Sequence, residues 1–169
     1  MKKNIAVIGC GYWGKNLIRN FYELNSLNAI CDVDVKKLKS FQEKYPKINI
    51  YPNYKELLKK PEIDAIVIAT PAATHYTLST EAILANKDVF VEKPISLTYK
   101  EGESLVSLAK KKDKILMVGH ILEYHPAVIK LKEIIKEGEL EKINYIYSNR
   151  LNLGRFRTEE NILWSFAPH

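Results

Sequence analysis

The stretch Ile5 to Gly14, Ile-Ala-Val-Ile-Gly-Cys-Gly-Tyr-Trp-Gly, decides the fold of this 169-residue chain. Its first four residues are an apolar run of strand length, which predicts a buried strand over residues 5–8. Glycines at positions 9, 11 and 14 then form a GxGxxG pattern, and apolar residues recur at helical spacing over residues 13–24. A GxGxxG that directly follows a strand and opens a helix is typical of a dinucleotide-binding turn.

Each of the three glycines has a separate expected role in that turn. Gly9 permits the tight turn, Gly11 lets the backbone approach a pyrophosphate, and Gly14 permits close packing of helix on strand. Asp32 ends a second predicted strand and lies where a carboxylate would meet the adenosine ribose hydroxyls. Its charge would repel a 2′-phosphate, which favours NAD over NADP. Methyltransferases that use S-adenosylmethionine share such a turn and acid, so these residues alone leave that class open.

Apolar runs and amphipathic stretches alternate along the rest of the first two-thirds of the chain. This alternation predicts an α/β fold, a Rossmann-type doubly wound parallel sheet with helices on both faces. Asp34 is expected to cap one helix, and Thr98 with Glu101 another as a capping box. The further predicted strands are 28–33, 48–51, 64–69, 89–91 and 115–118, and the further predicted helices are 35–45, 54–59, 77–85 and 98–111.

The pattern changes after Gly119. A helix is predicted over residues 126–136, begun by Pro126 and ended by Gly138, and residues 141–153 alternate like a half-exposed strand. One strand cannot bury its own face. We therefore expect an NAD-binding domain over 1–120 and the incomplete start of a substrate domain over 121–169, which would be disordered after about residue 140 or associate through its open sheet into a homo-oligomer.

Composition narrows the possible partners and compartment. The net charge is +6, but the lysines are spread along predicted helices among acidic residues, so no nucleic-acid partner is expected. No apolar run approaches the roughly 20 residues that span a bilayer, and the N-terminal run is too short for a signal peptide. We expect a cytoplasmic protein without a membrane partner or metal site, in which Cys10 and Cys31 stay reduced.

Further motifs carry a resemblance to a known family. Thr70-Pro71, leading to His75, follows the fourth predicted strand. Glu92-Lys93-Pro94 closes the fifth predicted strand, and Gly119-His120 closes the sixth. Together with the glycine turn, they resemble the Gfo/Idh/MocA family of sugar and polyol oxidoreductases, not methyltransferases. Within it, the chain looks most like UDP-N-acetylglucosamine 3-dehydrogenases and the 3-dehydrogenases of the corresponding uronic acid.

The resemblance implies an α+β second domain built on an open, mostly antiparallel sheet. It also implies that Lys93 and His169 face the substrate, Lys93 stabilising a developing alkoxide and His169 accepting the hydroxyl proton. Many relatives carry an aspartate four residues before the histidine, where this chain has Ser165. Glu123 could accept a hydrogen bond from a sugar hydroxyl. Forked hydrogen bonds from Arg155 and Arg157 could hold a diphosphate or carboxylate.

The expected activity is transfer of a hydride from C3 of a UDP-N-acetylhexosamine, or its uronic acid, to NAD. Two alternatives stay open: a family dehydrogenase acting on a free sugar or polyol, and a truncated, non-catalytic NAD-binding module. The residues expected to contact the cofactor are Gly9, Gly11, Tyr12, Trp13, Gly14, Asp32, Thr70, Pro71, His75, Glu92 and Lys93.

Overall fold

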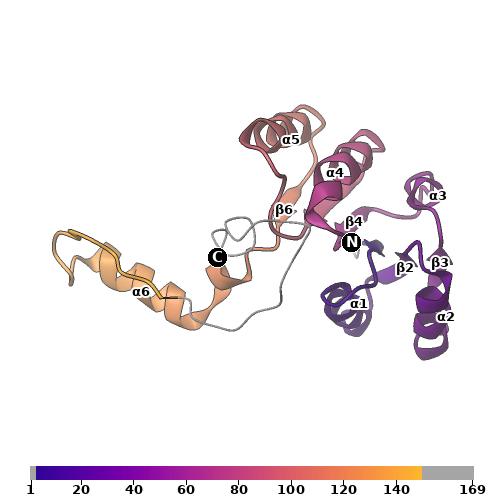
Figure 1. The fold of residues 1–169 in the computed structure, drawn as a ribbon, viewed down its shortest axis with the longest axis horizontal. Helices are drawn as coiled ribbons and strands as arrows, with labels where there is room; N and C mark the ends of the chain where they lie inside the picture. Colours follow the sequence, from indigo (N-terminus) through magenta and orange to yellow (C-terminus); the bar gives the residue numbers. More distant parts are fainter. Residues whose placement is uncertain (1–2, 150–169) are drawn as a thin grey trace. The chain divides into compact units, whose positions relative to one another are not determined.

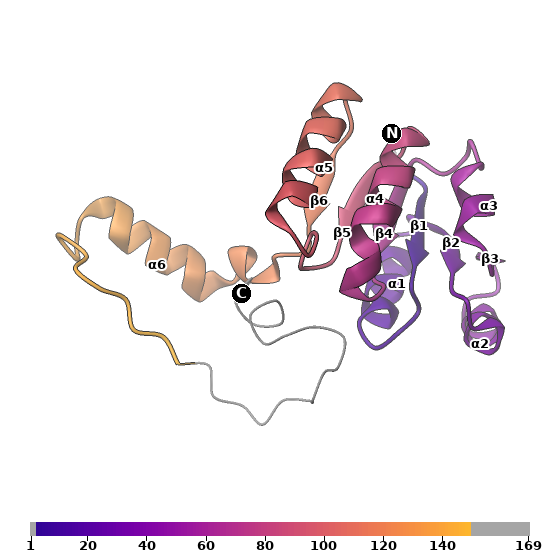
Figure 2. The ribbon, with the colours of Figure 1, turned by 45° about the horizontal axis from the view of Figure 1, so that its top comes forward.

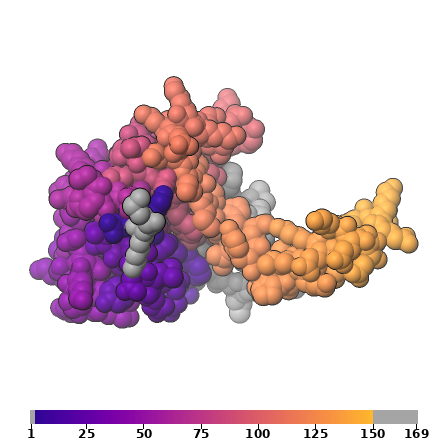
Figure 3. Space-filling model, turned by 180° about the vertical axis from the view of Figure 1, so that it is seen from behind, coloured from indigo at the N-terminus to yellow at the C-terminus, as the bar shows by residue number. Residues whose placement is uncertain are grey.

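The computed structural model describes residues 3–149 and divides the chain into two compact units, Met1–Gly119 (unit 1) and His120–His169 (unit 2). On the face drawn in Figure 3, the atoms of unit 1, coloured from indigo through magenta to orange, form one continuous body. Each unit is described here by itself.

Unit 1 is a parallel sheet of six strands in the order β3-β2-β1-β4-β5-β6, with helices between the strands (Figure 1). This confirms the predicted Rossmann-type, doubly wound sheet. The strands are β1 (Ile5–Ile8), β2 (Leu27–Cys31), β3 (Asn49–Tyr51), β4 (Ala65–Ile68), β5 (Asp88–Val91) and β6 (Leu116–Val118). The helices are α1 (Gly14–Glu23), α2 (Val35–Lys44), α3 (Tyr54–Leu58), the 3-10 turn η1 (Ala72–Thr74), α4 (His75–Leu84) and α5 (Tyr99–Lys111).

The core of unit 1 has two layers because successive residues of a strand point to opposite faces of the sheet. Ala6 and Ile8 of β1 belong to a buried cluster that also contains residues of α3, α4 and α5. Val7 belongs to a second cluster that contains residues of α1 and α2. Figure 2 shows α1 and α2 on one side of the sheet and α4 and α5 on the other. The sheet is therefore buried on both faces, as its continuous apolar strands predict.

The strand register aligns the carboxyl ends of the strands in one row. Ile8 pairs with both Cys31 and Ile68, and the row continues through Val91 to Val118. Main-chain bonds extend it by one residue, because Gly9, Ala69, Glu92 and Gly119 each donate to the last residue of a neighbouring strand. The residues that follow the strands therefore lie side by side at one edge, where the strand order reverses between β1 and β4 and where such folds bind ligands.

Helix ends follow the predicted caps with one difference. Asp34 accepts hydrogen bonds from the amides of Lys36 and Lys37, and Thr98 forms the capping box with Glu101. The helix predicted over 77–85 instead begins at His75, directly after the 3-10 turn. Pro71 is the N-cap of that 3-10 turn, so helical structure begins directly after the proline.

The described part of unit 2 contains the 3-10 turn η2 (Ile121–Tyr124) and helix α6 (Pro126–Glu137). Pro126 begins α6, and Gly138, at a left-handed φ of 78°, ends it, as predicted. No α6 side chain is buried among residues 120–149. Residues 141–149 form no strand, contrary to the prediction, since within the described residues they have no neighbouring strand to pair with.

Candidate cofactor-binding site

The glycine turn between β1 and α1 is shaped by two of its three glycines. Gly9 has a φ of +97°, and a β-carbon there would lie 2.6 Å from the carbonyl oxygen of Ala69. At Gly14 a β-carbon would lie 1.9 Å from the carbonyl oxygen of Gly9. A β-carbon at Gly11 would meet nothing within 4 Å. The fold itself therefore requires Gly9 and Gly14, whereas Gly11 borders open space at the N-terminus of α1, which no side chain caps.

Asp32 anchors this turn from the end of β2. Its Oδ2 accepts a hydrogen bond from the amide of Cys10 at 2.8 Å, and its Oδ1 accepts one from the amide of Asp34 at 2.9 Å. Burial raises the pKa of the Cys10 thiol to about 12, and the same cause raises the pKa of the Cys31 thiol to about 12. Both cysteines are free and buried in this structure.

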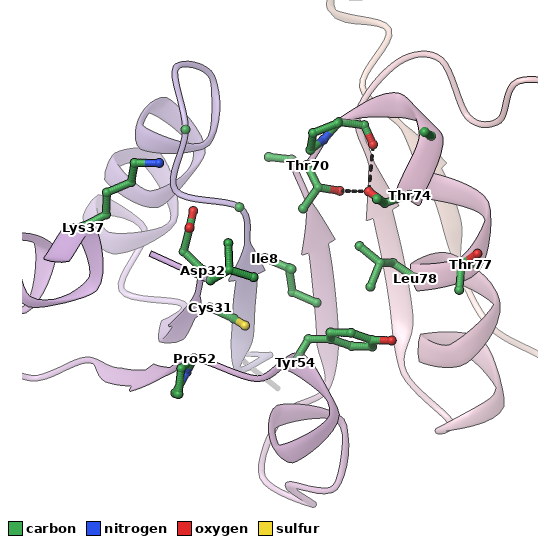
Figure 4. A pocket seen from close by; sticks show the side chains of 16 residues that line it. Ile8, Cys31, Asp32, Lys37, Pro52, Tyr54, Thr70, Thr74, Thr77 and Leu78 are labelled. Atoms are coloured by element: carbon green, nitrogen blue, oxygen red, sulfur yellow. Dashed lines mark hydrogen bonds between the residues drawn. The ribbon is translucent and has the colours of Figure 1, made fainter. Parts of the chain in front are cut away.

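A pocket of about 680 Å³ opens at this edge of the sheet (Figure 4). Asp32 and Lys37 line one side of it, and Thr70 and Thr74 line the other. The Thr74 hydroxyl donates to the Pro71 carbonyl at 2.7 Å, so the Thr70 hydroxyl is the donor in its 2.6 Å bond to Thr74. These bonds fix the pocket wall that begins at the end of β4.

A second group of predicted residues lies along the same edge, at the end of β5. The indole N–H of Trp13 donates to Oε1 of Glu92 at 2.7 Å, which joins the glycine turn to the Glu-Lys-Pro segment. Burial raises the pKa of Glu92, although the Trp13 bond opposes the rise. A β-carbon at Gly119 would lie 2.9 Å from Oε1 of Glu92, so the end of β6 leaves room for this carboxylate. The Lys93–Pro94 peptide bond is cis.

His75 connects the two groups. Only 1% of its surface is exposed. Its Nδ1 lies 2.6 Å from the carbonyl oxygen of Pro94, and its Nε2 lies 2.8 Å from the carbonyl oxygen of Thr70. The ring does not line the pocket but bridges the turn after β4 and the turn after β5.

The predicted cofactor residues thus fall into two sets. The residues that line the pocket are Gly9, Gly11, Asp32, Thr70 and Pro71, and those that do not are Tyr12, Trp13, Gly14, His75, Glu92 and Lys93. Tyr12 is 71% exposed and lies under the Lys15 ammonium group.

Other residues that line the pocket were not predicted from the sequence, among them Val33, Pro52 and Tyr54. Val33 is apolar but 92% exposed. Its position directly after Asp32 was the one feature of the sequence that could have identified it as a residue lining the pocket.

The predicted substrate residues lie elsewhere. Glu123 belongs to unit 2, where its ion pair with Lys132 lowers its pKa. Arg155, Arg157 and His169 lie outside the described residues. Among residues 3–149, no three His, Cys, Asp or Glu side chains gather in a way that could hold a metal ion. In the same span, no helix has the length and apolar character needed to cross a bilayer.

Residues 3–120 match the sequence profile of GFO_IDH_MocA, described as an oxidoreductase family with an NAD-binding Rossmann fold. The chain belongs to this family. Family relatives include an uncharacterized oxidoreductase, YrbE of Bacillus subtilis, with 33% identity over 83% of this chain and 42% of its own length. They also include the myo-inositol 2-dehydrogenase of Thermotoga maritima, with 32% identity over 82% of this chain and 42% of that protein.

Solved structures of the family agree with the fold. The WlbA dehydrogenase of Chromobacterium violaceum, in complex with NADH and UDP-GlcNAcA, is 25% identical. It superposes with a TM-score of 0.77 over 83% of this chain and 42% of its own. The chain thus spans less than half the length of the relatives it matches.

Proposed function

We propose that this chain is the cofactor-binding half, with the start of the substrate-binding half, of an NAD-dependent dehydrogenase. The substrate class proposed is a UDP-N-acetylhexosamine or its uronic acid, oxidised at C3. The observation that carries the cofactor part is the row of residues at the carboxyl edge, in which Asp32, Gly9, Thr70 and Glu92 follow neighbouring strands.

The residues of the row fit an extended dinucleotide. Asp32 keeps acceptor capacity on both oxygens, because a carboxylate oxygen can accept more than one hydrogen bond, and it faces the pocket where an adenosine ribose would lie. The open space at Gly11 and the N-terminus of α1 suit a pyrophosphate. The remaining length of the cofactor would then extend past Thr70 toward the end of β5.

The same row of residues at the carboxyl edge of the sheet supports a catalytic role for Lys93. When bound, the nicotinamide would take up the hydride of a secondary alcohol, which is chemistry that belongs to the cofactor. The Lys93 ammonium group, directly after Glu92, would stabilise the developing alkoxide. A histidine accepts protons near neutral pH, so His169 remains our proposed proton acceptor.

Two kinds of relative support different substrates. The WlbA complex supports a nucleotide-linked sugar, and in that case Arg155 and Arg157 would hold the diphosphate or carboxylate and Glu123 a sugar hydroxyl. The Thermotoga relative supports a free polyol as the second candidate. For the first candidate, a dehydrogenase of nucleotide-linked sugars, we also propose that copies of the protein associate through the second domain into a homo-oligomer. If neither substrate class binds, the remaining alternative is an NAD-binding module.

Calorimetric titration tests the cofactor part with two matched variants. Asp32→Ser and Asp34→Ser each remove one carboxylate after β2, but only Asp32 lines the pocket, whereas Asp34 caps α2 and serine preserves a cap. We expect the wild type to bind NAD more tightly than NADP. Asp32→Ser should weaken NAD binding about tenfold, the equivalent of roughly 1.4 kcal/mol, and Asp34→Ser should leave it unchanged. Equal affinity of the wild type for NAD and NADP would contradict the role of Asp32.

The substrate part is tested on the NAD-loaded protein. We expect UDP-N-acetylglucosamine or its uronic acid to bind and to be oxidised at C3, and myo-inositol to do neither. Binding of myo-inositol alone would favour the polyol alternative. Cofactor binding without either substrate would favour the NAD-binding module.

A further inference from the structure

The surroundings of the His75 ring determine how many protons it carries. Both of its ring nitrogens point at main-chain carbonyl oxygens, of Pro94 and Thr70. A carbonyl oxygen only accepts hydrogen bonds. A neutral imidazole has one N–H, so one of its nitrogens would face a carbonyl oxygen lone pair to lone pair, whereas the imidazolium donates to both.

We propose that His75 is a positioning residue: as an imidazolium, it ties the turn after β4 to the turn after β5 and so fixes Lys93 beside the cofactor pocket. Lys93 immediately precedes Pro94, whose carbonyl oxygen the ring holds. The importance of Lys93 rests on the proposed function, but the tie between the two turns does not.

Both ring nitrogens lie within hydrogen-bond distance of their carbonyl oxygens, at 2.6 Å from Pro94 and 2.8 Å from Thr70. A buried charge also needs an opposite charge nearby. An acidic group within electrostatic range of the ring is Glu92 at the end of β5, whose pKa burial raises.

The ring also acts on the pocket wall. Thr70 lines the pocket, and its carbonyl oxygen is held by His75. Its hydroxyl is held separately, by Thr74 in the turn before α4. One buried side chain at the first residue of α4 therefore connects the wall of the cofactor pocket to the lysine proposed to act on the substrate.

Nitrogen NMR of the labelled histidine ring tests the protonation state without substrate or cofactor. The His75→Gln variant assigns the signal among the four histidines of the chain. We expect both His75 nitrogens to carry protons in the folded protein, as donation to two carbonyl oxygens requires. One unprotonated nitrogen in the folded protein at pH 7 would overturn the proposal, whatever substrate the protein turns out to use.

A double-mutant cycle tests the positioning. We expect His75→Gln to lower kcat about tenfold or more while KM changes little, because a displaced lysine stabilises the transition state less. In a Lys93→Ala background the same change should lower kcat less than about twofold, since the residue it positions is gone. Equal losses in both backgrounds would overturn the positioning role.

Ser79→Ala is the matched control for this cycle. Ser79 is buried in the same helix, and its hydroxyl has no hydrogen-bond partner within the described residues. We expect its removal to leave kcat unchanged.

A wild type that binds NAD but turns over no sugar or polyol would count against the proposed function alone, because the ring NMR would still decide the protonation state of His75.

Discussion

At the scale of single residues, the three glycines of the turn have different expected roles: Gly9 and Gly14 are needed for folding, and Gly11 for binding the cofactor. We predict that Gly14→Ala destabilises the protein by about 3 kcal/mol or more, because its β-carbon would overlap the Gly9 carbonyl oxygen. Gly11→Ala should change stability by less than about 1 kcal/mol but weaken NAD binding about tenfold, since its methyl group would occupy space open to a pyrophosphate. Urea unfolding and NAD titration of both variants check this. A Gly11→Ala protein that binds NAD like the wild type would place the pyrophosphate elsewhere.

The two buried thiols make stability depend on alkaline pH. Burial raises the pKa values of Cys10 and Cys31 to about 12, whereas an unfolded cysteine ionises near pH 8.5. Between these values the folded protein binds more protons than the unfolded chain, so stability falls as pH rises. We predict a loss of roughly 2–3 kcal/mol per thiol between pH 7.5 and 10.5 in urea unfolding.

The double variant Cys10→Ala, Cys31→Ala is the control, because lysines and tyrosines also titrate in this range. Its stability should fall less steeply over the same interval than that of the wild type. Identical slopes would show that the thiols ionise as easily in the folded protein as in the unfolded chain.

Sequence spacing could locate some site residues and not others. Asp32 was predictable because a carboxylate at the second strand end follows from the glycine turn and the βαβ spacing. The bond between Trp13 and Glu92 was not, since it joins positions 79 apart in sequence. Whether such residues meet depends on strand order, which places β4 alone between β1 and β5. The burial of His75 between two carbonyl oxygens has no local signal at all.

At the scale of elements, strands buried on both faces were predictable as apolar runs, and residues 64–69 contain β4 as expected. Residues 141–149 show the limit of that reasoning. Alternation records which face a strand would bury, but a strand forms only where a partner supplies hydrogen bonds. Capping signals were more secure, as at Thr98 and Gly138, because a cap acts within a few residues of the helix end.

At the scale of the whole molecule, everything that forms the pocket lies in unit 1. Both buried clusters and all strands of the described chain lie between Ile5 and Val118, and the lining residues fall between Ile8 and Leu78. We predict that a fragment of residues 1–119 unfolds in one cooperative transition and binds NAD within about threefold of the whole chain's affinity. Thermal unfolding and calorimetry measure both quantities. The same fragment carrying Asp32→Ser should fold but bind NAD about tenfold more weakly, which separates specific binding from general affinity for nucleotides. A fragment that folds without binding NAD would mean that unit 2 completes the cofactor site, and one that does not fold would mean that unit 2 supports the sheet.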